Sequence, residues 1–164
     1  LLLDAGASVN HATLHGETPL ILACQAGNTA CAGLLIAAGA DVDRRQAAAV
    51  SRRTALRHAS EKGHVECVRL LLGTRATVDL VSDLGDNSET SLCKASRAGH
   101  PECVRLLLGA GADVQHTNIH GHTAMQLAVR SSHSACIALL GRPLWRPNTE
   151  TPSADLRARL LQVP

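Results

Sequence analysis

Nine histidines and six cysteines are the residues of this 164-residue chain that could bind a metal or attack a substrate. His116, His120 and His122 lie close enough along the chain for three imidazoles to converge on zinc. His11 and His15 stand at the places equivalent to His116 and His120 in an earlier stretch, which indicates an inherited turn sequence rather than a zinc site. We therefore predict no metal at these histidines.

Two short segments resemble part of another zinc centre. Residues 64–66 (HVE) and 100–102 (HPE) have the H-x-E order in which zinc deaminases place a metal ligand and a proton-transferring glutamate, but the required P-C-x-x-C is absent. Gly109 and Gly111 follow a predicted helix, whereas a nucleotide-binding glycine loop follows a strand. No Ser-His-Asp or Cys-His pairing has support. The sequence predicts no catalytic residue and no cofactor.

Four of the six cysteines share one register, at Cys31, Cys67, Cys103 and Cys136, with spacings of 36, 36 and 33 residues. Successive helices pack with axes about 8–10 Å apart, whereas a disulfide needs Cα atoms about 4.4–6.8 Å apart. No C-x-x-C occurs. We predict that these cysteines are small buried hydrophobic residues.

The cysteine register belongs to a repeat that covers most of the chain. Residues 63–73 read GHVECVRLLLG and residues 99–109 read GHPECVRLLLG. A threonine recurs at Thr18, Thr54, Thr90 and Thr123, and 24 positions after each of the first three stands a valine, at Val42, Val78 and Val114. The intervening connections vary in length. A rigid unit therefore alternates with an adjustable loop, which is typical of a repeat array.

Each rigid unit predicts two short helices. The threonines are suited to cap the first helix, with proline directly after Thr18, and glycines at 27, 63 and 99 are suited to end it. In the second helix, Cys67, Val68, Leu71 and Leu72 form one apolar stripe. Neither helix of a pair can bury such a stripe alone, so the units must stack.

These blocks resemble ankyrin repeats, in the T-P-L-H-x-A motif, the Gly-His pair and the closing "GADV" at residues 39–42 and 111–114. The family's Gly-His pattern also accounts for the two H-x-E segments. The resemblance implies an all-α, ankyrin-type solenoid of stacked helix-turn-helix repeats with projecting loop fingers. Arg75 stands where Gly39 and Gly111 end their helices, so we expect a positive φ at Arg75, at a cost of about 1 kcal/mol.

The resemblance also implies the domain organisation. The ankyrin-repeat domain covers residues 1–141, with a partial repeat at 1–9 and repeats near 10–45, 46–81, 82–117 and 118–141, and a C-terminal tail covers 142–164. Thr151-Pro152 could begin one last helix over 152–162, with Leu156, Leu160 and Leu161 on one side. Since the chain opens on what reads as the end of a helix, we treat it as a fragment whose first repeat is truncated before Leu1.

The two longer connections carry opposite charge. Residues 43–53 have a net charge of +3 and residues 79–89 a net charge of −4. Two interpretations stay open: the two loops neutralise each other, or they form a bipolar patch that selects a partner of complementary charge.

The function that the resemblance implies is non-catalytic binding of another protein in the concave groove, as a scaffold or adaptor module. The side chains at the family's variable contact positions, with those of the fingers, are Glu17, Gln25, Arg45, Arg52, Arg53, Glu61, Lys62, Asp83, Asp86, Glu89, Arg97, His122 and Arg130. One alternative is nucleic-acid binding through the loop from Arg44 to Arg53, although that loop has no aromatic side chain to stack bases. The other is a substrate-adaptor role within a larger protein.

Composition narrows the partners further. The net charge of +2 is too small to attract a polyanion over distance, and no stretch approaches the length of a membrane helix. The first residues do not have the basic flank followed by an apolar run that a signal peptide would show. We expect a monomer in the cytoplasm or nucleus, with a protein rather than a nucleic acid as its main partner and with no membrane partner.

Overall fold

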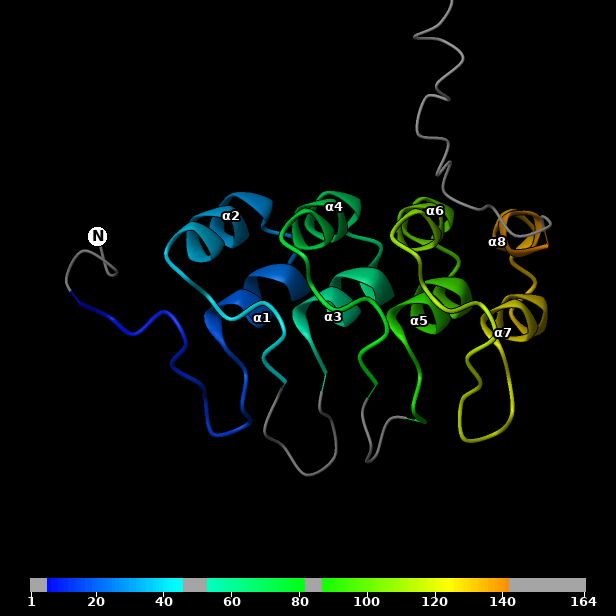
Figure 1. The fold of residues 1–164 in the computed structure, drawn as a ribbon, viewed down its shortest axis with the longest axis horizontal. Coiled ribbons are helices and arrows are strands. Elements are labelled where there is room, and N and C mark those ends of the chain that lie inside the picture. Colours follow the sequence, from blue (N-terminus) through cyan, green and yellow to red (C-terminus); the bar gives the residue numbers. More distant parts are fainter. Residues whose placement is uncertain (1–5, 46–52, 82–86, 142–164) are drawn as a thin grey trace, which may run out of the picture.

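The computed structural model describes residues 6–45, 53–81 and 87–141 of the chain, and all regular structure in them is helical (Figure 1). The all-α prediction is confirmed. The eight helices are α1 (Pro19–Gln25), α2 (Thr29–Ala37), α3 (Ala55–Lys62), α4 (Val65–Gly73), α5 (Ser91–Ala98), α6 (Pro101–Gly109), α7 (Ala124–Arg130) and α8 (Ser134–Leu140).

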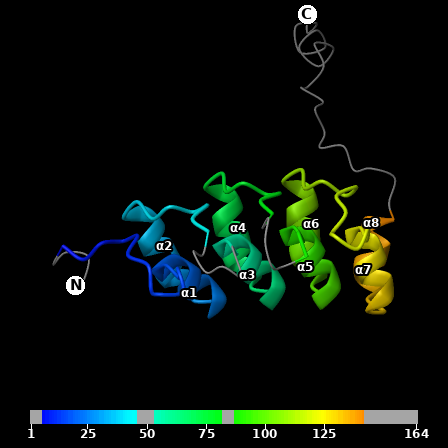
Figure 2. The ribbon, with the colours of Figure 1, turned by 90° about the horizontal axis from the view of Figure 1, so that it is seen from below.

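The helices form antiparallel pairs that stack side by side. Figure 1 shows an inner row of α1, α3, α5 and α7 and an outer row of α2, α4, α6 and α8, and the described parts of the loops that precede α1, α3, α5 and α7 project beyond the inner row. We call these four loops, in chain order, the first to the last finger. Each inner helix contacts its outer partner and the next inner helix, and each outer helix contacts the next outer helix (Figures 1 and 2). The predicted solenoid of stacked pairs is therefore present.

The threonine caps are formed as predicted. The side-chain oxygens of Thr18, Thr54, Thr90 and Thr123 each accept a hydrogen bond from the backbone amide three residues later. The cap satisfies one of the amides that an α-helix leaves without a partner in its first turn. This contact fixes where every inner helix begins.

The helix ends also follow the prediction. Gly63 and Gly99 end α3 and α5 in the left-handed conformation, with φ of 74° and 79°. Arg75 has φ of 63° at the place of Gly39 and Gly111, so the strained arginine expected from the sequence is observed. Ser132 takes the corresponding conformation after α7, with φ of 59°.

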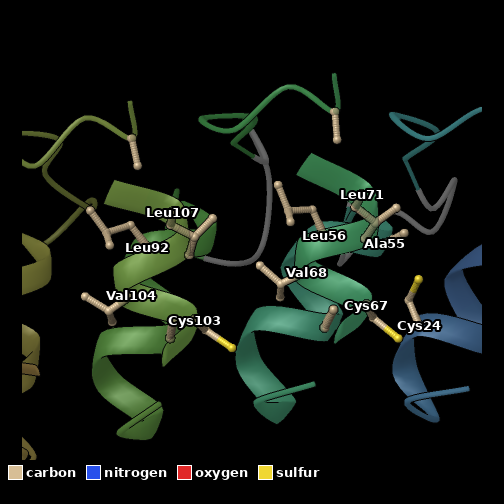
Figure 3. Close-up of a cluster of buried hydrophobic side chains, with 14 of the residues drawn as sticks. Cys24, Ala55, Leu56, Cys67, Val68, Leu71, Leu92, Cys103, Val104 and Leu107 are labelled. Carbon is tan, nitrogen blue, oxygen red and sulfur yellow. The ribbon is translucent and has the colours of Figure 1, made fainter. Parts of the chain in front are cut away.

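The core lies between the two rows (Figure 3). Cys67, Val68 and Leu71 of α4 have no exposed surface, but Leu72, which the sequence placed in the same stripe, is only half-buried. Burial raises the pKa of the Cys24 thiol from 9.0 to about 12, and the neighbouring Cys67 thiol adds to the rise. The Cys24 thiol therefore stays protonated near neutral pH and packs as a small hydrophobic group.

The prediction for Cys31 is wrong. Cys67, Cys103 and Cys136 are buried as expected, whereas Cys31 is exposed. Cysteines at this position of the repeat face the preceding helix pair. Cys67, for example, faces Thr29 of the preceding pair, with 3.4 Å between its sulfur and the threonine hydroxyl oxygen. No helix of the described residues precedes the pair formed by α1 and α2, so nothing there covers Cys31.

The predicted helix over 152–162 lies outside the described residues. Arg75 and Ser132 share their left-handed backbone with Asn87 and Ser88, which lie in the third finger. In residues 6–45, 53–81 and 87–141, no helix is long and apolar enough to cross a membrane.

Candidate protein-binding surface

Three histidines tie successive helix pairs together. The Nε2 atoms of His64, His100 and His133 lie 3.2, 3.1 and 3.1 Å from the carbonyl oxygens of Gln25, Glu61 and Arg97. A carbonyl oxygen only accepts, so each ring carries a proton on Nε2 and donates it. The two H-x-E segments therefore have the structural role that the sequence predicted, because their histidines cap the inner helix of the preceding pair.

Each of these rings occupies the space that a glycine leaves open. A Cβ atom on Gly63 would lie 2.5 Å from Nδ1 of His100, and one on Gly99 would lie 2.5 Å from Nδ1 of His133. Glycine therefore meets two requirements here, the left-handed backbone and the close approach of the next pair.

A second set of ties joins the bases of the fingers. The backbone amide of Thr77 donates to Oδ1 of Asp43 at 2.9 Å, and the amide of Asp113 donates to Oδ2 of Asp79 at 3.1 Å. Burial raises the pKa of Asp79 above its usual 3.8, although the bond from the Asp113 amide opposes the rise. The two aspartates thus hold successive pairs in register, in addition to adding charge to the fingers.

A chain of alternating charges links the inner row. Arg53 and Glu61 pair at 3.1 Å, and the Lys94 ammonium lies 4.0 Å from Oε1 of Glu61 and 3.3 Å from Oε2 of Glu89. Arg97 holds the same Glu89 carboxylate at 3.0 Å. We call these five residues the inner-row ion network.

The network is deeply buried at its centre. Only 3% of the Lys94 side chain and 1% of the Glu89 side chain are exposed. The amide nitrogen of Asn118, in the next finger, also donates to Oε1 of Glu89 at 3.3 Å. Charges taken out of water need such partners, because each unpaired one would cost several kcal/mol. The five residues therefore tie α3 to α5, and Asn118 ties the following finger to the same carboxylate.

The contact residues expected from the sequence divide into four groups. Gln25, Lys62 and Arg130 are exposed, and Glu17, Arg45, Arg53, Glu61, Arg97 and His122 are half-buried. Glu89 is buried and already held by Lys94, Arg97 and Asn118, so its carboxylate has no surface to offer a partner in this conformation. Arg52, Asp83 and Asp86 lie outside the described residues.

Two fingertips expose apolar side chains that the sequence reasoning missed. In the first finger the amide of Thr13 donates to the Glu17 carbonyl at 3.0 Å, which closes a tight turn with Leu14 at its tip. In the last finger the amide of Asn118 donates to the His122 carbonyl at 3.0 Å and places Ile119 at the tip. Leu14 is 103% exposed and Ile119 is 65% exposed. A large apolar residue before His-Gly in both short connections was the available signal.

The loop histidines do not gather around a point. Nε2 of His116 lies 2.7 Å from the Ser88 carbonyl oxygen, and the ring centres of His120 and His122 are 6.2 Å apart. Within the described residues, no three His, Cys, Asp or Glu side chains are grouped closely enough to hold a metal ion.

A groove of about 560 Å³ runs along the outer row between α4, α6 and α8. Leu72, Leu106, Leu108 and Leu139 line it, and its ionisable side chains are Arg69 and Arg105. Each arginine pairs with the glutamate three residues before it, Glu66 or Glu102. Among the described residues that line the groove, none is therefore an acid, base or nucleophile that is free to act on a substrate.

The comparison with protein families agrees with this architecture. A family model described as ankyrin repeats (3 copies) matches residues 1–82 and 75–148. Ankyrin repeats are typically non-catalytic. Comparison with curated proteins finds no relative that matches the chain.

Proposed function

Because the chain belongs to the ankyrin repeat family, we propose that it is a protein-binding module whose partner lies against the fingertips and the inner row of helices. Exposed apolar side chains on this face support the proposal. Leu14 and Ile119 stand at the tips of the first and last fingers. Loops that a rigid scaffold positions carry a disproportionate share of the binding residues of proteins.

The polar side chains of the same face add selectivity. Gln25, Lys62 and Arg130 are exposed at or near the ends of inner helices, and Arg97 is held in place by Glu89. A side chain that is already ordered loses less entropy when it meets a partner. The charged middle fingers, with Arg45, Arg52, Asp83 and Asp86, would extend this selection if they face the partner rather than each other.

The supporting features fit a scaffold or adaptor better than a polyanion receptor. The inner-row ion network alternates in sign, so it offers no run of positive charge for phosphates. All six cysteines are free thiols, as a reducing compartment such as the cytoplasm or nucleus permits. A substrate-adaptor role within a larger protein is one form of this function.

The test compares matched surface variants of the full chain. Proteins captured from lysate by the immobilised chain are identified by mass spectrometry, and the affinity of each purified candidate is then measured. The double variant Leu14→Ser with Ile119→Ser should lower the affinity for the true partner at least about tenfold, as the loss of well-packed apolar contacts does. Leu34→Ser, which removes a 69% exposed leucine from the outer helix α2, is the control and should leave the affinity unchanged.

The proposal fails if the two variants have equal effects. It also fails if Leu34→Ser alone lowers the affinity for the partner, since the partner would then bind to the outer row of helices. Thermal unfolding of each variant shows whether a lost affinity reflects a lost fold, because all three leucine and isoleucine sites are exposed and should leave the melting temperature nearly unchanged.

A further inference from the structure

The last helix pair leaves open a face that every earlier pair covers. Val129 of α7 stands six residues after its threonine cap and is 54% exposed. The residues at the same register in the preceding inner helices, Cys24, Ser60 and Ser96, are each 0% exposed. They are covered because a further pair packs against them, and no described helix follows α8.

Two other positions of the last pair show the same contrast. Met125 is half-buried, whereas its equivalents Leu20, Leu56 and Leu92 are at most 1% exposed. Ile137 of α8 is also half-buried, while its equivalents Val68 and Val104 have no exposed surface. We call the face formed by Met125, Val129 and Ile137 the open end.

The composition of the open end is that of a buried interface rather than a terminal surface. A repeat array that ends in solvent normally carries polar residues on its last face. Here the register retains methionine, valine and isoleucine, the residue types that bury apolar area. Something apolar should therefore cover this face.

The chain itself continues from this point. Helix α8 ends at Leu140, and residues 142–164 follow directly, outside the described part of the structure. This segment contains Thr151-Pro152, the same pair that begins α1 at Thr18-Pro19, and after it Leu156, Leu160 and Leu161 at helical spacing. A tethered segment reaches a neighbouring face at an effective concentration in the millimolar range.

We propose that residues 152–162 form a helix that packs across the open end, where the next inner helix of the stack would lie. Leu156, Leu160 and Leu161 would cover Val129, Met125 and Ile137. The eleven residues from Gly141 to Thr151 span up to roughly 36 Å when extended, and neighbouring helix axes are about 8–10 Å apart, so the connection is long enough. The segment thus closes the array in place of another repeat.

The test uses the full chain with substitutions on either side of this contact. Leu160→Asp with Leu161→Asp places charge on the apolar side of the segment, and Val129→Asp places charge on the open end. Each should speed amide hydrogen exchange in α7 by about tenfold, because the cover that slows local opening is lost. Combining the two sets should add little, since both remove the same contact.

The control places the same charge on the opposite side of the same helix. Ala158→Asp with Gln162→Asp should leave exchange in α7 at the wild-type rate. The proposal is overturned if Leu160→Asp with Leu161→Asp leaves α7 exchange unchanged, or if the control speeds it equally. It is also overturned if light scattering shows a dimer that Val129→Asp dissociates, because a second copy would then cover the open end.

Discussion

At the scale of single residues, the contact between a glycine and the next pair's histidine leaves no room for a side chain on the glycine. Gly63 has φ of 74°, and a Cβ atom there would lie 2.5–2.8 Å from three ring atoms of His100. Gly63→Ala should therefore strain the backbone and displace the ring from the Glu61 carbonyl. We expect a loss of roughly 2–3 kcal/mol in the free energy of unfolding, measured by urea denaturation.

A second glycine-to-alanine change serves as the control, because it distinguishes the effect of this clash from the effect of replacing any glycine with alanine. Gly73 is the last residue of α4, is exposed, and has no atom within 4 Å of where its Cβ would lie. Gly73→Ala should keep the stability or raise it by up to about 1 kcal/mol, because alanine favours a helix. Equal losses in both variants would contradict the role assigned to the histidine.

At the scale of helices, what the sequence predicted depends on how local each cause is. The threonine caps and the left-handed Arg75 could be foreseen because a cap or a helix end involves residues within four positions. The exposure of Cys31 could not, because the residue type is the same as in Cys67 and only the absence of a preceding described pair differs.

The inner-row ion network lies between the features that could be foreseen from the sequence and those that could not. The sequence predicted that four of its residues contact a partner protein: Arg53, Glu61, Glu89 and Arg97. In the structure Arg53 pairs with Glu61, and Glu89 pairs with Arg97. Whether two side chains eight positions apart meet depends on the turn between them, which composition does not specify. A signal was present nonetheless, because the order Arg-then-Glu in one repeat becomes Glu-then-Arg in the next.

The network makes a prediction for α5. Lys94→Met removes the ammonium that lies 3.3 Å from Oε2 of Glu89 and leaves a buried carboxylate with fewer cations around it. Losing one partner of a buried pair typically costs about 3 kcal/mol, and we expect a loss of that size in urea denaturation. Lys62→Met makes the same replacement at an exposed position of α3 and should change stability by less than about 0.5 kcal/mol. A similar loss in both variants would argue against the network.

At the scale of the whole molecule, stability is distributed along one direction. Each inner helix packs mainly against its outer partner and the adjacent inner helices, and the extensive contacts among the described helices all lie within a pair or between neighbouring pairs. The free energy of the array is then close to a sum of pair terms and interface terms between neighbours. The effect of a substitution should therefore spread further along the array when its helix takes part in more interfaces between pairs.

Two leucines at the same register make this measurable. Leu20 in α1 and Leu56 in α3 are each 1% exposed, but α1 has one described inner neighbour and α3 has two. Either leucine-to-alanine change should cost about 2–5 kcal/mol. In hydrogen exchange, Leu20→Ala should lower the protection of α1 and α2 alone, because the later pairs still support one another.

Leu56→Ala should act further along the chain. Weakening α3 loosens its interfaces with both α1 and α5, so protection in α1 through α4 should fall together while α7 keeps its wild-type exchange rate. A uniform loss of protection over all eight described helices in both variants would instead mean that the stack unfolds as one unit. Nearest-neighbour coupling would then be too strong for a partner, or a covering segment at one end, to order one region of the array without the rest.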